Sequence, residues 1–302
     1  MMPLPTHKSA FVALIGRPNC GKSTLLNTIL GEELAVVTPL PQTTRKNMRG
    51  IFTGKDLQLV FVDTPGIHRG RHSLNRNMSE ESSRLVKKRG VDIVCHIVDS
   101  SRLPGEEEDL VAQLTRESGI PAIVVFNKKD LCQSIDQFVA LFYERYPDLK
   151  SCVHLAISAI EKEAKEQFLK ALLPLVPDGP EYFPADDLTD ADLRFFAAEY
   201  VRKHIICNTK DEVPHAVFVE VREYRESQDG HHVEVDLHVE TDGQKAIIIG
   251  KKGALIQKIQ RDAARDLEKL TGVPAMIVSH VKISPKWRDD ERFLREMGFV
   301  AR

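Results

Sequence analysis

Gly16-Arg-Pro-Asn-Cys-Gly-Lys-Ser23 fits the pattern G-x-x-x-x-G-K-[ST]. The apolar run Phe11–Ile15 precedes this stretch, and a segment with helical periodicity, Ser23–Leu30, follows it. In a strand–loop–helix setting, the glycines let backbone N–H groups wrap around a β-phosphate. The lysine then neutralises β- and γ-phosphate oxygens, and the serine hydroxyl ligates Mg²⁺. The stretch therefore predicts a P-loop, since a chance match in such a chain is expected only about once in a hundred.

Short apolar runs and longer helical segments alternate along the first half of the chain. The apolar runs are Phe11–Ile15, Leu57–Val62, Val91–Val98, Pro121–Phe126 and Cys152–Ile157. The helical segments are Ser23–Leu30, Asn75–Lys88, Glu106–Glu117 and Glu161–Leu173. This alternation predicts an α/β fold with a doubly wound, mostly parallel sheet. Arg45–Thr53 predicts one extra strand, which would pair antiparallel with Leu57–Val62 as a hairpin.

Two polar motifs follow the buried runs and extend the nucleotide prediction. Asp63-Thr64-Pro65-Gly66 comes directly after Leu57–Val62, where the carboxylate can hold Mg²⁺ and the Gly66 N–H can sense a γ-phosphate. Asn127-Lys128-Lys129-Asp130 follows Ile123–Phe126, and an aspartate there can accept from both N1–H and the 2-amino group of guanine. Asn127 can bond N7, and the stem of Lys128 can lie on the base. The order of the motifs favours guanine over adenine.

Two weaker elements complete the site. Ser158-Ala159 ends the run Cys152–Ile157, where the Ala159 N–H can meet guanine O6. Between Lys22 and Asp63, the stretch Gln42-Thr43-Thr44-Arg45 is the best candidate for a switch that supplies a second Mg²⁺ ligand. We favour Thr44 over Thr43 as this ligand, although sequence spacing does not choose between them.

The second half of the chain is predicted to form a separate α+β module. Leu173–Pro184 contains four prolines and one glycine in twelve residues, which ends the preceding helix. Beyond it the patterns predict two helices, a hairpin and two further strands or extended runs. These are a helix near Leu193–Ile205, hairpin strands His215–Val221 and Val233–Val239 joined by Gln228–Gly230, a strand or extended run Ala246–Ile249, a helix near Ala254–Leu270 and a strand Met276–Ile283.

Gly250-Lys251-Lys252-Gly253 stands between the Ile-rich run and the helix near Ala254–Leu270. Glycines at both ends allow a nucleic-acid backbone to approach, and the two lysines can pair with its phosphates. Lys258 and Arg261 lie along the following helix, while Lys286 and Trp287 come later in the chain. Trp287 can stack on a base or pack on the helix, and packing is slightly favoured. These residues are the candidates for binding single-stranded nucleic acid.

The composition excludes several classes of protein. Lys plus Arg number 42 and Asp plus Glu 44, a net charge of −2 that by itself argues against nucleic-acid binding. The charges are unevenly placed, however, since residues 245–302 contain 13 basic and 7 acidic side chains. Five widely spaced cysteines without a C-x-x-C pair fit neither a disulfide framework nor a zinc site and indicate a reduced compartment. Neither a signal peptide nor a membrane-spanning stretch is expected.

The series GRPNCGKS, QTTR, DTPG, NKKD and SA resembles the translation-factor-related class of small GTPases, and within it the Era family of bacterial ribosome-assembly GTPases. The resemblance covers essentially the whole chain, including Asp190–Tyr200, GQKAIIIGKKGALIQKI and WRDDERFLREMGFV. Cys20 and Ile160–Ala164 depart from the residues common in that family, without touching a proposed ligand. The resemblance implies a G domain at residues 8–174, a linker at 175–190 and a type II KH domain at 191–302.

The resemblance also implies a set of site residues and partners. Residues expected to bind GTP are Gly16, Arg17, Pro18, Asn19, Cys20, Gly21, Lys22, Ser23, Thr24, Asp63, Thr64, Pro65, Gly66, Asn127, Lys128, Lys129, Asp130, Ser158 and Ala159. Mg²⁺ is expected on Ser23, Thr44 and Asp63. The expected partners are GTP, GDP, the 3′ end of 16S ribosomal RNA and the 30S subunit. The protein is expected to be a cytoplasmic monomer acting in 30S maturation, and peripheral contact with the inner membrane is left open.

The catalytic group is less well defined by the sequence. Ile67 follows Gly66, where many GTPases place a water-orienting glutamine, and an apolar side chain cannot orient water. Catalysis is therefore assigned to Lys22, Thr44 and Asn19, with slow intrinsic turnover. By resemblance, Asn19 helps to bind K⁺ near the phosphates, while the plainer interpretation is that it only stabilises the loop.

Two other functions fit parts of the sequence. A GTPase of tRNA modification, membrane transport or another translation-linked role would share only the G domain. A passive RNA-binding module with a vestigial nucleotide pocket would keep only the KH domain, but intact Lys22, Ser23 and Asp63 weigh against it.

Overall fold

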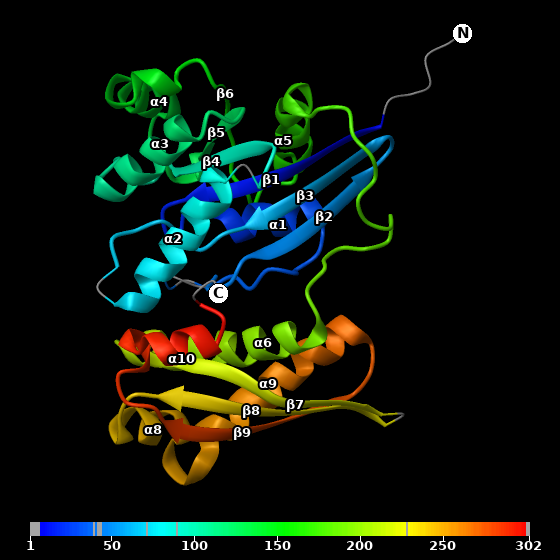
Figure 1. Ribbon diagram of the computed structural model, residues 1–302, viewed down its shortest axis with the longest axis vertical. Coiled ribbons are helices and arrows are strands. Elements are labelled where there is room, and N and C mark those ends of the chain that lie inside the picture. Colours follow the sequence, from blue (N-terminus) through cyan, green and yellow to red (C-terminus); the bar gives the residue numbers. More distant parts are fainter. Residues whose placement is uncertain are drawn as a thin grey trace. The chain divides into compact units, whose positions relative to one another are not determined.

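The structure, a computed structural model, describes residues 7–38, 40, 44–70, 72–88, 90–227 and 229–299. The chain forms two compact units (Figure 1). The first takes in Met1–Ala35, Thr44–Arg71 and Asn75–Asp190, and the second Val36–Thr43, His72–Leu74 and Ala191–Arg302.

A six-stranded sheet with the order β2-β3-β1-β4-β5-β6 forms the centre of the first unit. The strands are β1 (Lys8–Gly16), β2 (Met48–Gly54), β3 (Leu57–Asp63), β4 (Ile93–Asp99), β5 (Ala122–Asn127) and β6 (Val153–Ala156). All neighbours pair in parallel except β2 and β3, which form an antiparallel hairpin. The predicted mostly parallel α/β fold and the extra hairpin strand are both confirmed.

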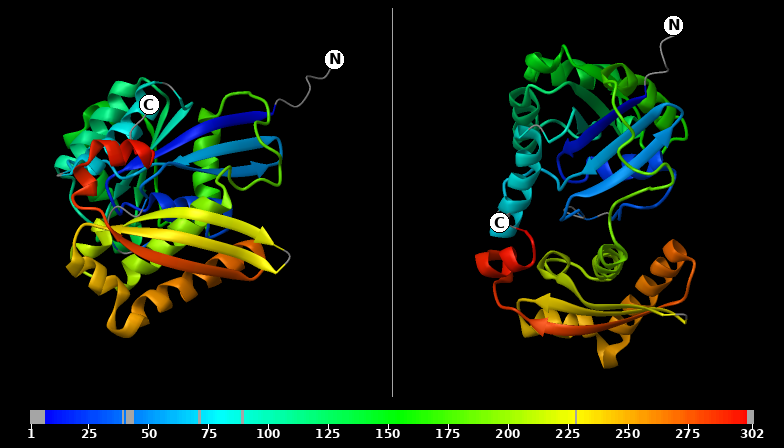
Figure 2. Two further views of the ribbon diagram at one scale, coloured as in Figure 1. Left: turned by 60° about the horizontal axis from the view of Figure 1, so that its bottom comes forward. Right: turned by 45° about the vertical axis from the view of Figure 1, so that its right-hand side comes forward.

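Helices cover both faces of this sheet (Figure 2). They are α1 (Lys22–Leu30), α2 (Ser73–Lys87), α3 (Glu106–Ser118), α4 (Ile135–Arg145) and α5 (Ala164–Leu172), with short 3-10 turns η1 (Lys129–Leu131), η2 (Pro147–Leu149) and η3 (Leu173–Leu175). Phe61 of β3 packs on Phe168 of α5, with ring centroids 6.0 Å apart. On the opposite face, Val94 and Val124 pack in apolar clusters with α2, α3 and α4. Because the parallel strands end at one edge, the motifs that follow β1, β3, β5 and β6 gather there.

The segment 175–190, predicted as a linker, lies along the first unit. The Gln58 side chain donates to Phe183 O at 2.8 Å and accepts from the Tyr182 backbone N–H at 2.7 Å. The Ile51 N–H donates to Leu188 O at 2.8 Å. The segment thus covers part of the edge that β2 leaves open in the sheet.

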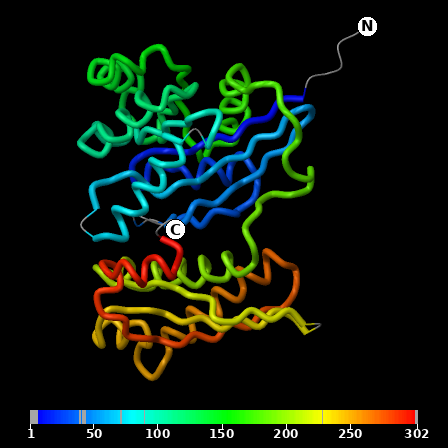
Figure 3. Tube along the Cα trace, in the orientation of Figure 1, coloured from blue at the N-terminus to red at the C-terminus, as the bar shows by residue number. Residues whose placement is uncertain are grey.

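The second unit contains a three-stranded sheet with the order β7-β8-β9. Its strands are β7 (Phe218–Ser227), β8 (Gly230–Val239) and β9 (Ala275–Ile283). Its helices are α6 (Leu193–Asn208), α7 (Val213–Ala216), α8 (Asp242–Ile249), α9 (Ala254–Thr271) and α10 (Glu291–Glu296), with 3-10 turns η4 (Lys251–Gly253) and η5 (Trp287–Asp289). β7 and β8 form the predicted hairpin, except that His215 and Ala216 of the predicted first strand belong to α7. β9 runs parallel to β8. Figure 3 traces the chain through the sheet and its helices. Gln228 of the predicted turn is outside the described residues.

The prediction of a strand or extended run at Ala246–Ile249 is wrong, because these residues are the second half of α8. Thr241 begins this helix, and its hydroxyl accepts a hydrogen bond from the Gln244 N–H at 3.3 Å. A short apolar run does not distinguish a strand from a partly buried helix. In the helix, Ile248 is buried while Ile247 is 49% exposed.

Two properties of the whole chain complete the description. All five cysteines are free thiols. Among the described residues, none of the helices combines the length and the apolar character needed to cross a bilayer.

Candidate nucleotide site and candidate nucleic-acid interface

The loop between β1 and α1 has a conformation that requires glycine at two positions. A Cβ on Gly16 would lie 2.5 Å from both Ile97 O and Cys20 Sγ. Gly21 has φ 98°, and a Cβ there would lie 2.2 Å from Asn127 Nδ2. Asn19 is also left-handed, with φ 62°. These constraints favour the G-x-x-x-x-G pattern that the sequence shows.

Three oxygens predicted to ligate Mg²⁺ lie together in the structure. Ser23 Oγ donates to Asp63 Oδ2 at 2.6 Å and lies 3.1 Å from Thr44 Oγ1. Thr44 Oγ1 is 3.2 Å from the same carboxylate oxygen. Hard oxygen donors of this kind suit Mg²⁺. Thr43, the other threonine considered, lies outside the described residues.

The phosphate-loop lysine and the segment after β3 lie close to this cluster. Lys22 is buried, and its Nζ donates to Arg17 O at 3.3 Å. The buried Thr64 hydroxyl donates to Leu14 O at 2.7 Å, which ties the segment Asp63–Gly66 to β1. A Cβ on Gly66 would lie 2.8 Å from Pro18 Cα, so the two loops touch through their backbones.

Asn127 connects three of the predicted motifs. Its Nδ2 donates to Cys20 O at 2.8 Å, and its Oδ1 accepts from the Ala159 N–H at 2.9 Å. The contact between the Ala159 N–H and guanine O6 stays a prediction. Ser158 is buried beside it, and the Thr28 hydroxyl donates to Ala159 O at 2.6 Å.

Lys128 is held by a residue that the sequence argument missed. Lys128 has φ 61°, and its Nζ donates to Asp99 Oδ2 at 2.9 Å. Arg102 Nε lies 3.1 Å from the same oxygen, and its NH2 group donates to Pro18 O at 2.7 Å. Asp99 and Arg102 therefore join the predicted base loop to the P-loop. The only hint in the sequence is that Asp99 ends a buried strand.

The other predicted GTP-binding residues lie in the same loops with different surroundings. Lys129 pairs with Glu161 at 2.8 Å, and Asp130 is exposed. Cys20 is fully buried, and this burial raises the pKa of its thiol. Arg17 is only 4% exposed, and its guanidinium contacts Glu108 in the interior. Ile67 is 4% exposed within an apolar cluster, where its side chain cannot orient water.

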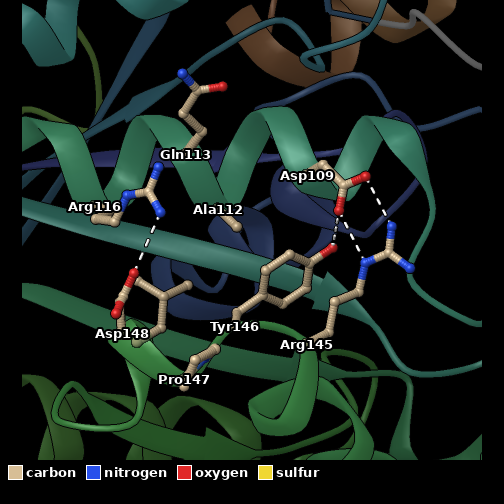
Figure 4. A pocket seen from close by; sticks show the side chains of 9 residues that line it. Asp109, Ala112, Gln113, Arg116, Arg145, Tyr146, Pro147 and Asp148 are labelled. Carbon is tan, nitrogen blue, oxygen red and sulfur yellow. Dashed lines mark hydrogen bonds and ion pairs between the residues drawn. The ribbon is translucent and has the colours of Figure 1, made fainter.

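A separate hollow of about 340 Å³ lies between α3 and the end of α4 (Figure 4). Arg145 and the Tyr146 hydroxyl both donate to Asp109, and Arg116 donates to Asp148 at 3.2 Å. Its lining residues belong to none of the predicted motifs, and these charges pair across the hollow. The nucleotide site is therefore assigned to the motif loops and not to this hollow.

In the second unit, the Gly250–Gly253 loop joins α8 to α9 through three residues with a positive φ. Gly250 has φ 72° and ψ 176°, Lys252 has φ 53°, and Gly253 has φ 79°. A Cβ on Gly250 would lie 2.7 Å from Leu255 Cβ. Lys251 and Lys252 are exposed, as a phosphate backbone would require.

The remaining RNA-binding candidates divide into exposed cations and a buried ring. Lys258, Arg261 and Lys286 are exposed, and Lys258 pairs with Asp262 at 3.5 Å. Trp287 is 1% exposed, and its Nε1 donates to Ala216 O at 2.8 Å. Its place among the RNA-binding candidates is wrong in this structure, because a buried ring cannot stack on a base. Packing, the favoured interpretation, is what the structure has.

Comparisons with known proteins agree with both halves of this description. A family described as 50S ribosome-binding GTPase matches residues 11–128, and a KH domain family matches residues 212–288. The GTPase Era of Geobacter metallireducens is 40% identical over 297 residues, which cover 97% of this chain and 98% of that protein. The GTPase Era of Ruminiclostridium cellulolyticum is 37% identical over the same shares of the two chains.

Two solved structures of Era proteins are also similar to this chain over nearly its whole length. An Era variant from Aquifex aeolicus bound to GDP·AlF4− has a TM-score of 0.90 at 30% identity, covering 97% of this chain and 100% of that one. An Era structure in complex with MgGDPNP and nucleotides 1506–1542 of 16S ribosomal RNA also has a TM-score of 0.90, at 29% identity, covering 97% and 99%. With the P-loop, the guanine motif and the Gly-Lys-Lys-Gly loop in place, the chain belongs to the Era family of GTPases.

Proposed function

We propose that the chain hydrolyses GTP with Mg²⁺ held by Ser23, Thr44 and Asp63. The observation that carries this proposal is the convergence of Ser23 Oγ and Thr44 Oγ1 on Asp63 Oδ2, at 2.6 and 3.2 Å. All three are hard oxygen donors. Ser23 is the last residue of the P-loop and Asp63 the last residue of β3, as in other P-loop GTPases. When bound, Mg²⁺ neutralises charge that develops on the phosphate oxygens.

Lys22, Thr44 and Asn19 are the proposed catalytic residues. Lys22 donates to Arg17 O in this structure and would exchange that acceptor for phosphate oxygens. Because the Ile67 side chain cannot orient water, intrinsic turnover is expected to be slow. The exposed, left-handed Asn19 is proposed to help bind K⁺, and equal hydrolysis rates in K⁺ and Na⁺ would refute that role.

The second proposed activity is binding of the 3′ end of 16S ribosomal RNA during 30S maturation. A relative binds nucleotides 1506–1542 of that RNA, and this chain has the exposed Lys251 and Lys252 on a left-handed loop. We propose a G domain at 8–174, a connecting segment at 175–190 and an RNA-binding KH domain at 191–302. We also propose that the protein is cytoplasmic, because its proposed partner is the 30S subunit, and that it is a monomer.

Hydrolysis assays with three proteins test the two activities together. The wild type, Lys22→Ala and Gly253→Asp are compared with and without an oligonucleotide of the 16S 3′ end. Lys22→Ala should abolish hydrolysis but still bind the oligonucleotide, and Gly253→Asp should hydrolyse GTP but not respond to RNA. If the wild type neither binds the oligonucleotide nor changes its turnover, the coupled function is wrong.

A further inference from the structure

Next to the P-loop, the first unit contains a buried row of three ionisable side chains that the proposed chemistry does not use. Arg17 Nε lies 2.6 Å from Glu108 Oε2, and the two side chains are 4% and 0% exposed. Glu108 Oε1 lies 2.7 Å from Nε2 of His96, which is also fully buried. The three residues come from the P-loop, α3 and β4, so the row connects the phosphate loop to the interior.

Arg17 is tied to the site through its own backbone and side chain. Its carbonyl oxygen accepts from Lys22 Nζ at 3.3 Å. Its guanidinium also donates to Leu103 O at 3.1 Å and to Asp99 O at 3.3 Å. A shift of Arg17 would therefore move an acceptor of the phosphate-binding lysine.

Glu108 is in turn fixed by the helix that carries it. Its N–H donates to Gly105 O at 2.8 Å in the first turn of α3. The outer side of the same helix is anchored across the hollow of Figure 4, where Asp109 accepts from Arg145 and Tyr146. Glu108 thus presents its carboxylate to Arg17 from a rigid support.

Hydrogen-bond partners hold both nitrogens of the His96 ring. Nε2 lies 2.7 Å from Glu108 Oε1, and Nδ1 lies 3.2 Å from Thr115 Oγ1, which is itself 2.8 Å from Val111 O. The ring is therefore fixed between β4 and α3 and orients the Glu108 carboxylate from the interior.

Apolar side chains surround the rest of the His96 ring. From α4 the neighbour is the Phe142 ring, at 6.0 Å between centroids. On the flanking strands β1 and β5, His96 is paired with Ile15 and Val124. The contact between His96 and Glu108 is therefore shielded from water, since both side chains are fully buried.

We propose that Glu108 and His96 are positioning residues of the nucleotide site, which fix the P-loop through Arg17. The proposal rests on the nucleotide site described under Proposed function. Lys22 remains the residue that touches the phosphates, and Glu108 acts only through Arg17.

Nucleotide affinity tests the positioning role. Glu108→Gln keeps the size of the side chain and removes its charge, and Glu107→Gln in the same helical turn is the matched control. Glu108→Gln should raise the Kd for both GTP and GDP by about tenfold or more, because the P-loop loses its fixed position. Glu107→Gln should leave both constants unchanged, and far-UV circular dichroism checks that each variant folds.

A double-mutant cycle distinguishes an effect of the contact between Arg17 and Glu108 from a general loss of structure. If Arg17 and Glu108 act as one unit, Arg17→Gln with Glu108→Gln should weaken binding no more than either single change. Additive losses, or a Glu108→Gln affinity equal to that of Glu107→Gln, would overturn the positioning role. A wild type that binds no nucleotide would instead overturn the proposed site itself.

Discussion

At the scale of single residues, the hydroxyls of Ser23 and Thr44 lie at different distances from the Asp63 carboxylate, which the sequence motifs do not show. Thr44 Oγ1 lies 3.2 Å from Asp63 Oδ2, whereas Ser23 Oγ is bonded to it at 2.6 Å. A switch threonine is needed when the γ-phosphate is present, while the P-loop serine serves both nucleotides. The two hydroxyls should therefore differ in which nucleotide they favour.

Thr44→Ala should weaken binding of a GTP analogue in Mg²⁺ by at least about tenfold, the usual effect of losing one oriented metal contact. GDP affinity should change little. Titration calorimetry with each nucleotide measures the ratio, and Thr44→Ser, which keeps the hydroxyl, is the control. If the affinities for GTP and GDP fell equally, Thr44 would not be the switch residue that binds Mg²⁺ only with GTP.

Gly250, in the loop between α8 and α9, has a strict backbone requirement. At φ 72° and ψ 176°, and with Leu255 Cβ only 2.7 Å from the place that an added Cβ would take, alanine is both strained and crowded. Gly250→Ala should lower the free energy of unfolding by about 1–3 kcal/mol. Trp287, the single tryptophan and buried in this unit, reports the transition by fluorescence during urea unfolding.

Gly243→Ala is the matched control for this prediction. Gly243 lies in α8, and the nearest atom to its added Cβ is Thr241 Oγ1 at 3.8 Å. Alanine in a helix is favoured over glycine by up to about 1 kcal/mol, so the control should be neutral or more stable. A Gly250→Ala protein as stable as this control would contradict the strained geometry.

Two residues show where the sequence could and could not predict side-chain roles. The motif pattern placed Arg17 in the P-loop, but the direction of its side chain depends on Glu108, ninety-one positions away in the sequence. Trp287 lies within a basic stretch, and only the packed fold shows that Phe218 and Phe293 surround it, at 5.7 Å between centroids. Local patterns report the residue type that a site needs, whereas tertiary contacts decide which way the side chain points.

At the scale of helices and strands, most elements could be predicted from the sequence, but the helices α4 and α8 could not. The parallel strands are continuous apolar runs bounded by polar motifs, so their positions followed from the sequence. Helix α4 was missed because its aromatic and β-branched residues do not separate clearly from those of the neighbouring strands. α8 was misread because its Ile-rich end is equally compatible with a strand.

The helices α6 and α9 are joined by a partly buried charge cluster whose acid response can be predicted. Burial by itself would raise the pKa of Asp266, but hydrogen bonds from Lys203 and His204, each 2.9 Å long, lower it below the usual value. A carboxyl with a lowered pKa stabilises the fold fully above its unfolded value of about 3.9, and this stabilisation is lost as the pH falls through the folded value.

Asp266→Asn should remove this acid-sensitive contribution. The variant should lose about 1–3 kcal/mol of stability near pH 7, because two partly buried donors, Lys203 and His204, lose their charged acceptor. Its stability should then fall less steeply than that of the wild type between about pH 5 and pH 3. Urea unfolding followed through Trp287 at several pH values measures both effects. Parallel pH curves for the two proteins would contradict the assignment.

At the scale of the whole molecule, the near-neutral net charge conceals two chemically different parts. Residues 245–302 have 13 basic and 7 acidic side chains, although the chain as a whole has a net charge of −2. The Gly-Lys-Lys-Gly loop lies in this basic region, which is the part that would bind a phosphate backbone. RNA affinity should therefore depend on salt through a few lysines and not through the overall charge.

Lys251→Ala and Lys252→Ala should each reduce the slope of log affinity against log salt by about 0.7, the value for one phosphate contact on a single strand. Fluorescence anisotropy of a labelled 16S 3′-end oligonucleotide at several salt concentrations gives the slope. Lys269→Ala, exposed in the last turn of α9, is the control and should keep the wild-type slope. A slope reduced equally by all three would indicate only a general effect of charge.

The segment that leads into the second unit offers a route by which the nucleotide state can reach the RNA site. Arg49 of β2 pairs with Asp190 at 2.6 Å, and its carbonyl accepts from the Thr189 hydroxyl at 2.6 Å. β2 begins four residues after Thr44 and pairs with β3, which ends at Asp63. The chain enters the second unit at Ala191, directly after this anchor. A movement of the Mg²⁺ ligands would thus be transmitted through β2 to the start of that unit.

Arg49→Ala should therefore uncouple the two activities without removing either of them. The Arg49–Asp190 pair is partly exposed, and such pairs contribute only about 0–1 kcal/mol, so basal GTP hydrolysis and the fold should persist. The ratio of RNA affinities with a GTP analogue and with GDP should move toward one. By linkage, the effect of RNA on the ratio of GTP to GDP affinity should shrink by the same factor. Arg69→Ala, which breaks another exposed ion pair of the first unit, should keep the wild-type ratios. If Arg49→Ala keeps them as well, coupling does not pass through the anchor on β2.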